Sequence, residues 1–124
     1  MSKPSSGVAE HFNSPRNAGE MENPDAVGES SLDGRAPRIN IFLKSDGRSI
    51  EQATFQAFGC GYSIAACSVL TVRVTGRTLA EAAELTMGDI LAELGGVPVD
   101  KEFCADLAVK ALQDGLSKLH SGDN

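Results

Sequence analysis

Aromatic residues are scarce in this chain of 124 residues, which has no tryptophan, one tyrosine and five phenylalanines. So few rings leave little material for a platform on which nucleic-acid bases stack. The net charge of -6 and the pI near 4.8 argue against general affinity for nucleic acid or for anionic membrane surfaces. We therefore expect neither kind of partner.

Long hydrophobic runs are also missing. The longest, from Ile64 to Val74, is interrupted by serine, threonine and arginine and is too short to span a bilayer. The N-terminus is rich in serine and glycine, unlike a signal peptide. We expect a cytoplasmic protein that forms one domain over residues 1–124, with a flexible segment at residues 1–7.

Motifs of common active sites are absent too, because no phosphate-cradling glycine loop and no Ser/His/Asp set occurs. The two histidines, His11 and His120, suit packing and a solvated helix end. Three cysteines cannot all pair within one chain, and a reducing compartment keeps them as thiols. Metal binding or thiol chemistry therefore competes with simple burial as their role.

Two segments with alternating apolar residues, 38–44 and 50–58, predict strands. The Asp-Gly pair within residues 45–48 predicts that a type I′ turn joins them as a hairpin. Residues 16–35 are rich in Asn, Gly, Ser and Asp and predict irregular structure with at most one short strand, near 26–32.

Helical periodicity dominates the rest of the chain. The longest predicted helix runs from Lys101 to about His120, with Asp100 as its cap and one apolar stripe. Shorter helices are expected at residues 8–12, 63–75, 78–85 and 87–94, with Ser63, Thr78 and Thr86 as caps of the last three. The fold class is then α+β: a small antiparallel sheet of two to three strands packed against helices, with a long amphipathic C-terminal helix.

Two cysteines lie where a strand or loop enters a helix. Cys60 stands between Gly59 and Gly61, and Cys104 stands in the first turns of the C-terminal helix. Helix N-termini favour negative charge, so both sites favour a thiolate. The alternative is burial of an inert thiol, with Cys104 packing against Val99 as a hydrophobic staple.

Several motifs follow one another in a recognisable order. They are His11-Phe-x-x-Pro-Arg-Asn17-x-Gly19, Pro24-Asp25-Ala-x-Gly28, Phe55-Gln-Ala-Phe-Gly-Cys-Gly61, Gly76-x-Thr78 and Lys101-x-x-Cys104-x-x-Leu107-Ala108. Over about residues 8–119 the chain resembles the IscU/NifU/SufU iron-sulfur cluster assembly scaffolds. The resemblance implies a scaffold, not an enzyme, on which iron and sulfide from a cysteine desulfurase form a [2Fe-2S] cluster. It also implies recipient apo-proteins, an Hsp70-type chaperone system, and zinc as a second metal for the same ligands.

The match of site residues is partial. Cys60 and Cys104 fall on the second and third cysteines of the family, and Lys101 falls on its site lysine. The first cysteine and the aspartate that follows it are missing, because residues 32–37 contain no cysteine. Phe103 replaces the histidine found before the third cysteine in many members, and the chaperone-recognition segment is altered at residues 96–101.

Two matched thiols are too few for a [2Fe-2S] cluster or a closed zinc site, which take four ligands. Asp33 is the best local substitute for the lost carboxylate. Cys67 offers a third sulfur, but it lies two helical turns after Cys60 and suits a core position better. A homodimer that shares the site, or a small thiol that completes it, stays open.

Three functional hypotheses follow in order of preference. The first is a scaffold-like protein that binds iron or a labile cluster through Cys60 and Cys104, with Lys101 nearby. The second is a degenerate paralogue that acts as an adaptor or regulator in iron-sulfur assembly. The third is a sulfur-transfer protein that carries a persulfide on Cys60, with Cys104 as the resolving thiol.

Overall fold

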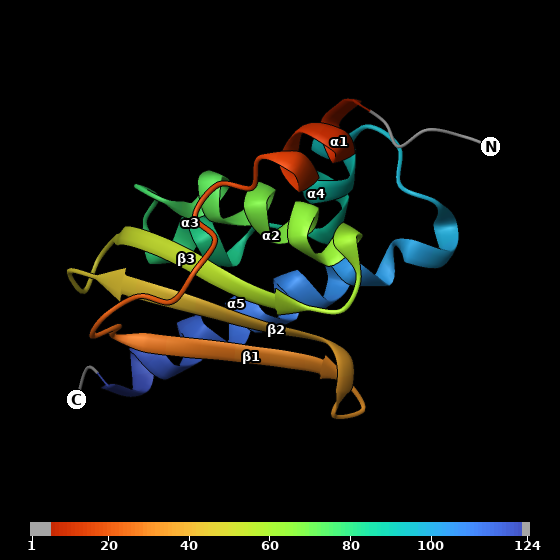
Figure 1. Cartoon of the computed structure of the whole chain (residues 1–124). Coiled ribbons are helices and arrows are strands. Elements are labelled where there is room, and N and C mark those ends of the chain that lie inside the picture. Colours follow the sequence, from red (N-terminus) through yellow and green to blue (C-terminus); the bar gives the residue numbers. More distant parts are fainter. Residues whose placement is uncertain (1–5, 123–124) are drawn as a thin grey trace.

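The computed structural model describes residues 6–122, which form three strands and several helices (Figure 1). In chain order these elements are α1 (Ser6–Asn13), β1 (Ala26–Leu32), β2 (Arg35–Ser45), β3 (Ile50–Phe58), α2 (Gly61–Val74), α3 (Leu79–Ala83), α4 (Met87–Leu94), the 3₁₀ helix η1 (Val99–Lys101) and α5 (Phe103–Gly122). All the predicted strands are present, including the short one at 26–32. Ser6 and Gly7, which we assigned to the flexible start, belong to α1; residues 1–5 lie outside the described part.

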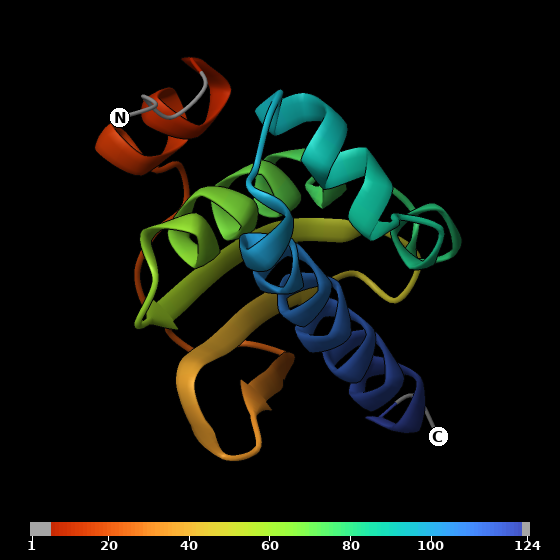
Figure 2. The same cartoon turned by 90° about the vertical axis from the view of Figure 1, so that its right-hand side faces the viewer.

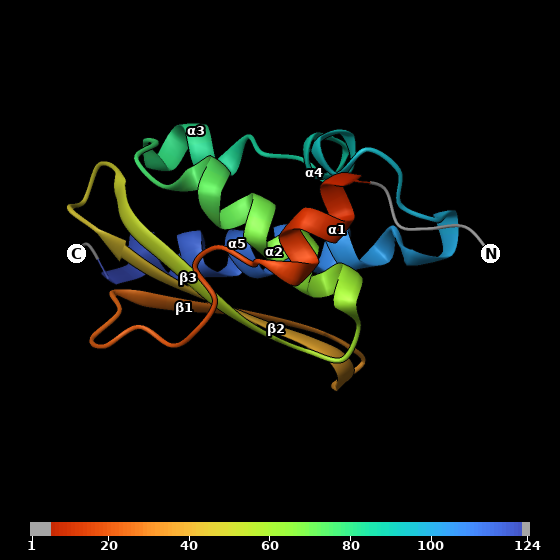
Figure 3. The same ribbon diagram turned by 45° about the horizontal axis from the view of Figure 1, so that its top comes forward.

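The three strands form one antiparallel sheet in the order β1-β2-β3. One face of it is covered by helices and the other carries none, as Figures 2 and 3 show. α5 packs across β1 and β2, α2 packs on β3 and on α5, and α1 lies on α2. Ile39, Ile41 and Leu43 are fully buried, as their alternation predicts.

The two Asp-Gly pairs that lie between strands form different turns. The type I′ turn predicted at residues 45–48 is wrong, because Asp46 does not have a positive φ. The Asp46 carboxylate instead accepts hydrogen bonds from the backbone N–H groups of Arg48 and Ser49, at 2.9 and 2.8 Å. The turn with two positive φ angles lies between β1 and β2, at Asp33 (52°) and Gly34 (78°).

Helix boundaries differ from the sequence prediction at two places. α2 begins at Gly61 with Cys60 as its N-cap, two residues before the predicted start at Ser63. α5 begins at Phe103, and the predicted cap Asp100 lies within η1 instead. Thr78 and Thr86 cap α3 and α4 as predicted, and each cap forms a capping box with the acidic residue three positions later. None of the helices within residues 6–122 is long and apolar enough to cross a membrane.

Backbone contact between β1 and α5 fixes how closely the long helix lies on the sheet. A Cβ atom at Gly28 would overlap the carbonyl oxygen of Ala111 and come within 2.5 Å of the Gly115 nitrogen. A Cβ atom at Gly115 would in turn lie 3.2 Å from the Gly28 nitrogen. Glycine at both positions lets strand and helix meet without a side chain between them.

We predict that Gly28→Ala lowers the free energy of unfolding by about 2 kcal/mol or more, because an added methyl group overpacks this contact. Urea unfolding followed by circular dichroism measures the change. The matched control is Gly88→Ala in α4, where the new Cβ atom would have 3.7 Å of space to the Thr86 hydroxyl oxygen. That variant should be neutral or stabilised by up to about 1 kcal/mol, and equal losses in both variants would contradict the prediction.

Candidate thiol site

Cys60 lies where β3 turns into α2. Gly59 precedes it with φ of 122°, and a Cβ atom there would lie 3.0 Å from the Cα atom of Pro37, so the turn requires glycine. Cys60 is the N-cap of α2, and its sulfur accepts a hydrogen bond from the Tyr62 N–H at 3.4 Å. The sequence pattern predicted a helix N-terminus near this thiol but missed that the thiol itself is the cap.

Cys104 is the second residue of α5 and is only 1% exposed. Its side chain lies close enough to that of Cys60 for the two thiols to interact. The pKa of Cys104 is raised to about 11, mainly by burial and also by the adjacent Cys60, while Ser63 and Lys101 act to lower it. The expectation that the helix dipole makes this thiol acidic is therefore wrong, because burial has the larger effect. The staple to Val99 is also wrong, since Val99 is 83% exposed.

The Ser63 side chain faces the Cys104 sulfur. The residue is fully buried, and in the described part of the chain its hydroxyl has no hydrogen-bond partner besides that sulfur. A buried hydroxyl without a good partner costs free energy, and a negatively charged sulfur is a stronger acceptor than a thiol. Ser63 therefore favours a thiolate at Cys104, once a cation compensates the free-energy cost of burying the negative charge.

A pocket of about 350 Å³ opens beside Cys60. Its walls are mostly apolar, and one cation, Lys101, lines it; the lining residues are Val8, Phe12, Cys60, Gly61, Tyr62 and Lys101. The Phe12 ring packs so closely on Gly61 that a Cβ atom there would lie 2.8 Å from it. Sequence reasoning missed Phe12 as part of the site, although it belongs to the quoted His-Phe-x-x-Pro-Arg-Asn motif.

The other two predicted donors lie apart from the pocket. Cys67 is fully buried in α2, close enough to Cys104 for the charges to interact, and burial raises its pKa well above the ordinary range. Asp33 is exposed in the turn between β1 and β2. Among residues 6–122 no group of three or more His, Cys, Asp and Glu side chains is arranged to hold a metal ion. The structure thus brings together Cys60, Cys104 and Lys101.

Polar side chains attach α1 to α2, in agreement with the packing role expected for His11. His11 is 6% exposed, and its Nδ1 lies 2.7 Å from the Ser68 hydroxyl oxygen. That oxygen also accepts the Arg16 N–H at 2.9 Å. Burial lowers the pKa of His11 and so favours a neutral ring, which can accept a hydrogen bond from the hydroxyl. The Asn17 amide donates to the Thr71 hydroxyl at 3.1 Å. These bonds place Phe12 beside Cys60.

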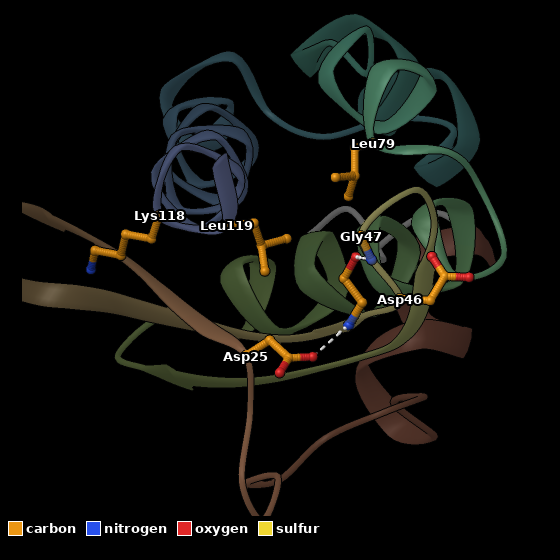
Figure 4. A pocket seen from close by; sticks show the side chains of 7 residues that line it. Asp25, Asp46, Gly47, Leu79, Lys118 and Leu119 are labelled. Atoms are coloured by element: carbon orange, nitrogen blue, oxygen red, sulfur yellow. Dashed lines mark hydrogen bonds between the residues drawn. The ribbon is translucent and has the colours of Figure 1, made fainter. Parts of the chain in front are cut away.

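A second hollow, of about 330 Å³, lies at the β2–β3 turn and the end of α5 (Figure 4). Its polar groups already have partners. Asp25 accepts the Ser45 N–H at 2.8 Å, and Lys118 donates to the Val27 carbonyl at 2.8 Å and pairs with Asp114. The thiol pocket therefore stays the candidate functional site.

A family model for the NifU-like N-terminal domain matches residues 4–123 of this sequence. The chain belongs to this family. The match covers both cysteines of the site and every strand and helix described above. The resemblance stated from the motifs is thereby confirmed.

Individual relatives agree with the family. The chain is 37% identical over 109 residues to the iron-sulfur cluster assembly scaffold protein IscU 1 of Archaeoglobus fulgidus, covering 88% of this chain and 71% of the relative. It is 38% identical over 107 residues to the scaffold protein IscU of Aquifex aeolicus, covering 85% and 68%. It is also 38% identical to the nitrogen fixation protein NifU of Azotobacter chroococcum, covering 89% of this chain but 36% of that protein.

Solved structures show the same fold. A protein from Fervidobacterium islandicum AW-1, described as a proposed scaffold for the SUF system, superposes with a TM-score of 0.75 at 22% identity, covering 90% of this chain and 95% of that one. The N-terminal part of a NifU-like protein from Brucella abortus gives 0.72 at 20% identity, covering 94% and 93%. The predicted α+β class of this NifU-like chain is confirmed.

Thiol labelling tests the burial order of the three cysteines of this NifU-like domain. In the native state iodoacetamide should modify Cys60 first, because Cys67 and Cys104 are 0% and 1% exposed and should react at least about ten times more slowly. Mass spectrometry of tryptic peptides gives the three rates. In guanidinium chloride all three should react at similar rates, and native labelling of Cys67 as fast as that of Cys60 would disprove the arrangement.

The docking of α1 predicts a pH effect on stability. Burial, and then the nearby Arg16 charge, lower the pKa of His11 below its ordinary value of 6.5. The unfolded chain therefore binds this proton more readily, so stability is complete above pH 6.5 and falls as pH falls below it. His11→Gln should flatten the stability curve between pH 7.5 and 5.5, measured by urea unfolding. An unchanged slope in the variant would show that another group causes the loss.

Proposed function

We propose that this protein is an iron-sulfur assembly scaffold that receives iron or a labile [2Fe-2S] cluster as cargo at Cys60 and Cys104. The observation that carries the proposal is the contact between these two thiols, where the N-termini of α2 and α5 meet. Thiolates are the usual protein ligands of iron-sulfur clusters. The relatives from Archaeoglobus and Aquifex named as scaffolds support the same role.

The residues around the thiols suit reversible binding. Bound iron favours loss of the thiol protons, because a metal ion stabilises the negative sulfur. Ser63 and Lys101 favour the deprotonated Cys104 that a metal requires. Two thiols from one chain are half of the ligand set of a cluster, so the cargo is held less firmly than in a four-cysteine site. Weak holding suits a carrier, which passes its cargo on and does not turn over a substrate.

The proposed partners follow from this role. A cysteine desulfurase supplies the sulfur, and recipient apo-proteins take the cluster. The segment at residues 96–101, which aligns with the chaperone-recognition segment of the family, includes the exposed Val99. We propose this segment as the contact for an Hsp70-type system. Zinc is an alternative occupant of the two thiols. Asp33 remains a candidate for a further ligand within the chain, while Cys67 is fully buried and suits a core position better.

Reconstitution tests the proposed function. Anaerobic incubation with iron, sulfide and a reductant should give a visible-absorbing protein with bound iron, and Cys60→Ser and Cys104→Ser should each abolish the absorbance by removing one of two thiols. Cys67→Ala is the matched control, because its side chain is fully buried and removing the sulfur leaves a small cavity. It should keep the absorbance if Cys67 is a core residue. A colourless, iron-free wild type would refute the scaffold function.

An adaptor without cargo is the second candidate, favoured by the absence of a three-donor group among residues 6–122. In that case desulfurase binding, measured by isothermal titration calorimetry, survives the Cys60→Ser/Cys104→Ser double substitution, and the wild type stays colourless after reconstitution. A scaffold gives the coloured wild type whatever the effect of the substitutions on desulfurase binding. The two candidates are thus separated by the colour of one sample.

A further inference from the structure

Three buried residues of α2 carry a hydroxyl group: Ser63, Ser68 and Thr71. The hydroxyls of Ser68 and Thr71 each make a hydrogen bond, at 2.7 and 2.9 Å. The Ser63 hydroxyl has no nitrogen or oxygen partner within residues 6–122, although the residue is 0% exposed. A buried hydroxyl without a partner costs free energy of folding. Packing in the empty protein therefore does not explain a serine at this position.

The side chain that Ser63 faces is that of Cys104, and the two lie close enough to interact. The backbone of Ser63 is fixed in the first turn of α2, where its N–H donates to the Cys60 carbonyl at 3.0 Å. A neutral thiol is a weak hydrogen-bond acceptor. Sulfur that binds a metal carries negative charge and accepts more strongly. The hydroxyl therefore gains a good partner when Cys104 holds a metal.

Consecutive residues of α2 provide one donor for each sulfur of the site. The Tyr62 N–H donates to the Cys60 sulfur at 3.4 Å, and the next residue, Ser63, faces the Cys104 sulfur. A hydrogen bond to sulfur withdraws electron density that the sulfur would otherwise give to a metal. The first turn of α2 is thus arranged to act on both sulfurs.

We propose that Ser63 is a positioning residue of the thiol site, whose hydroxyl donates a hydrogen bond to the Cys104 sulfur once that sulfur binds a metal. This role rests on the scaffold function proposed above. The bond favours loading, because the unpaired hydroxyl of the empty protein becomes paired in the loaded one. It also orients the Cys104 side chain toward the metal. Loss of a donor to a metal ligand typically weakens metal affinity about ten- to a hundred-fold.

Cobalt(II) alone tests this role, because the charge-transfer absorbance between sulfur and cobalt reports on the sulfur itself. Under anaerobic conditions Ser63→Ala should raise the dissociation constant for cobalt at least about ten-fold. The absorbance should also move to longer wavelength, because sulfur without the hydrogen bond gives up an electron more readily. A Ser63→Ala variant with the affinity and wavelength of the wild type would overturn the proposal. A wild type that binds no cobalt would refute the two-thiol metal site on which both proposals depend.

Thr54→Val is the matched control, because Thr54 is the second buried residue of the described structure whose hydroxyl has no partner. Thr54 precedes the core residue Phe55 on β3, so it lies on the sheet face that carries no helix. Both substitutions remove an unpaired hydroxyl, so urea unfolding should show no loss of stability in either empty variant. Cobalt binding should change in Ser63→Ala alone. An equal change in both variants, or a clear loss of stability in empty Ser63→Ala, would show that the hydroxyl serves the fold.

The loaded protein gives a second readout. Hydrogen bonds to the sulfurs help to set the reduction potential of an iron-sulfur cluster, and they stabilise its reduced, more negative state. Reconstituted Ser63→Ala should therefore have a lower midpoint potential than the wild type and Thr54→Val, in a redox titration followed by electron paramagnetic resonance. Equal potentials in all three proteins would overturn the role of Ser63 and leave the scaffold function standing. A wild type that stays colourless would refute the scaffold function, and this role with it.

Discussion

Close contact between the backbones of β1 and α5 is the constraint on which the rest of this structure depends. Gly28 and Gly115 let the long helix lie directly on the sheet, and the helix then runs alongside α2, which packs on β3. The position of α5 sets the position of its first turn. Farther along α5 the helix touches β1 with no side chain between them, and this contact sets where the first turn of α5 lies. Cys104 in that turn therefore meets Cys60.

The pattern of the sequence predicted the elements well because each depends on local chemistry. Alternation placed the strands, and Thr78 and Thr86 capped their helices as expected. The two Asp-Gly pairs between strands could not be told apart, because the choice of turn depends on strand register. At Asp46 the carboxylate binds two backbone N–H groups of a longer loop, whereas Asp33 and Gly34 close a loop of two residues.

The candidate site was less accessible to sequence reasoning. The glycines around Cys60 indicated a special turn, but the role of its sulfur as helix cap depends on where α2 begins. For Cys104 the sequence indicated a helix N-terminus, yet the pKa of a thiol depends on burial as well as on the dipole. Burial is set by tertiary packing, with Cys60 and Ser63 as neighbours from another helix. Family membership predicts the fold of this chain, but it does not predict a complete set of ligands for a metal or cluster.

The attachment of α1 has a consequence for access to the thiols. This helix packs on α2 and α4. Hydrogen bonds of Ser68 with His11 and Arg16 contribute to its attachment to α2. Elements held in this way open locally at a smaller free-energy cost than global unfolding. Phe12 of α1 lies on Gly61, the residue that follows the half-buried Cys60. A local opening of α1 would therefore uncover more of the surface around this thiol while the core stays folded.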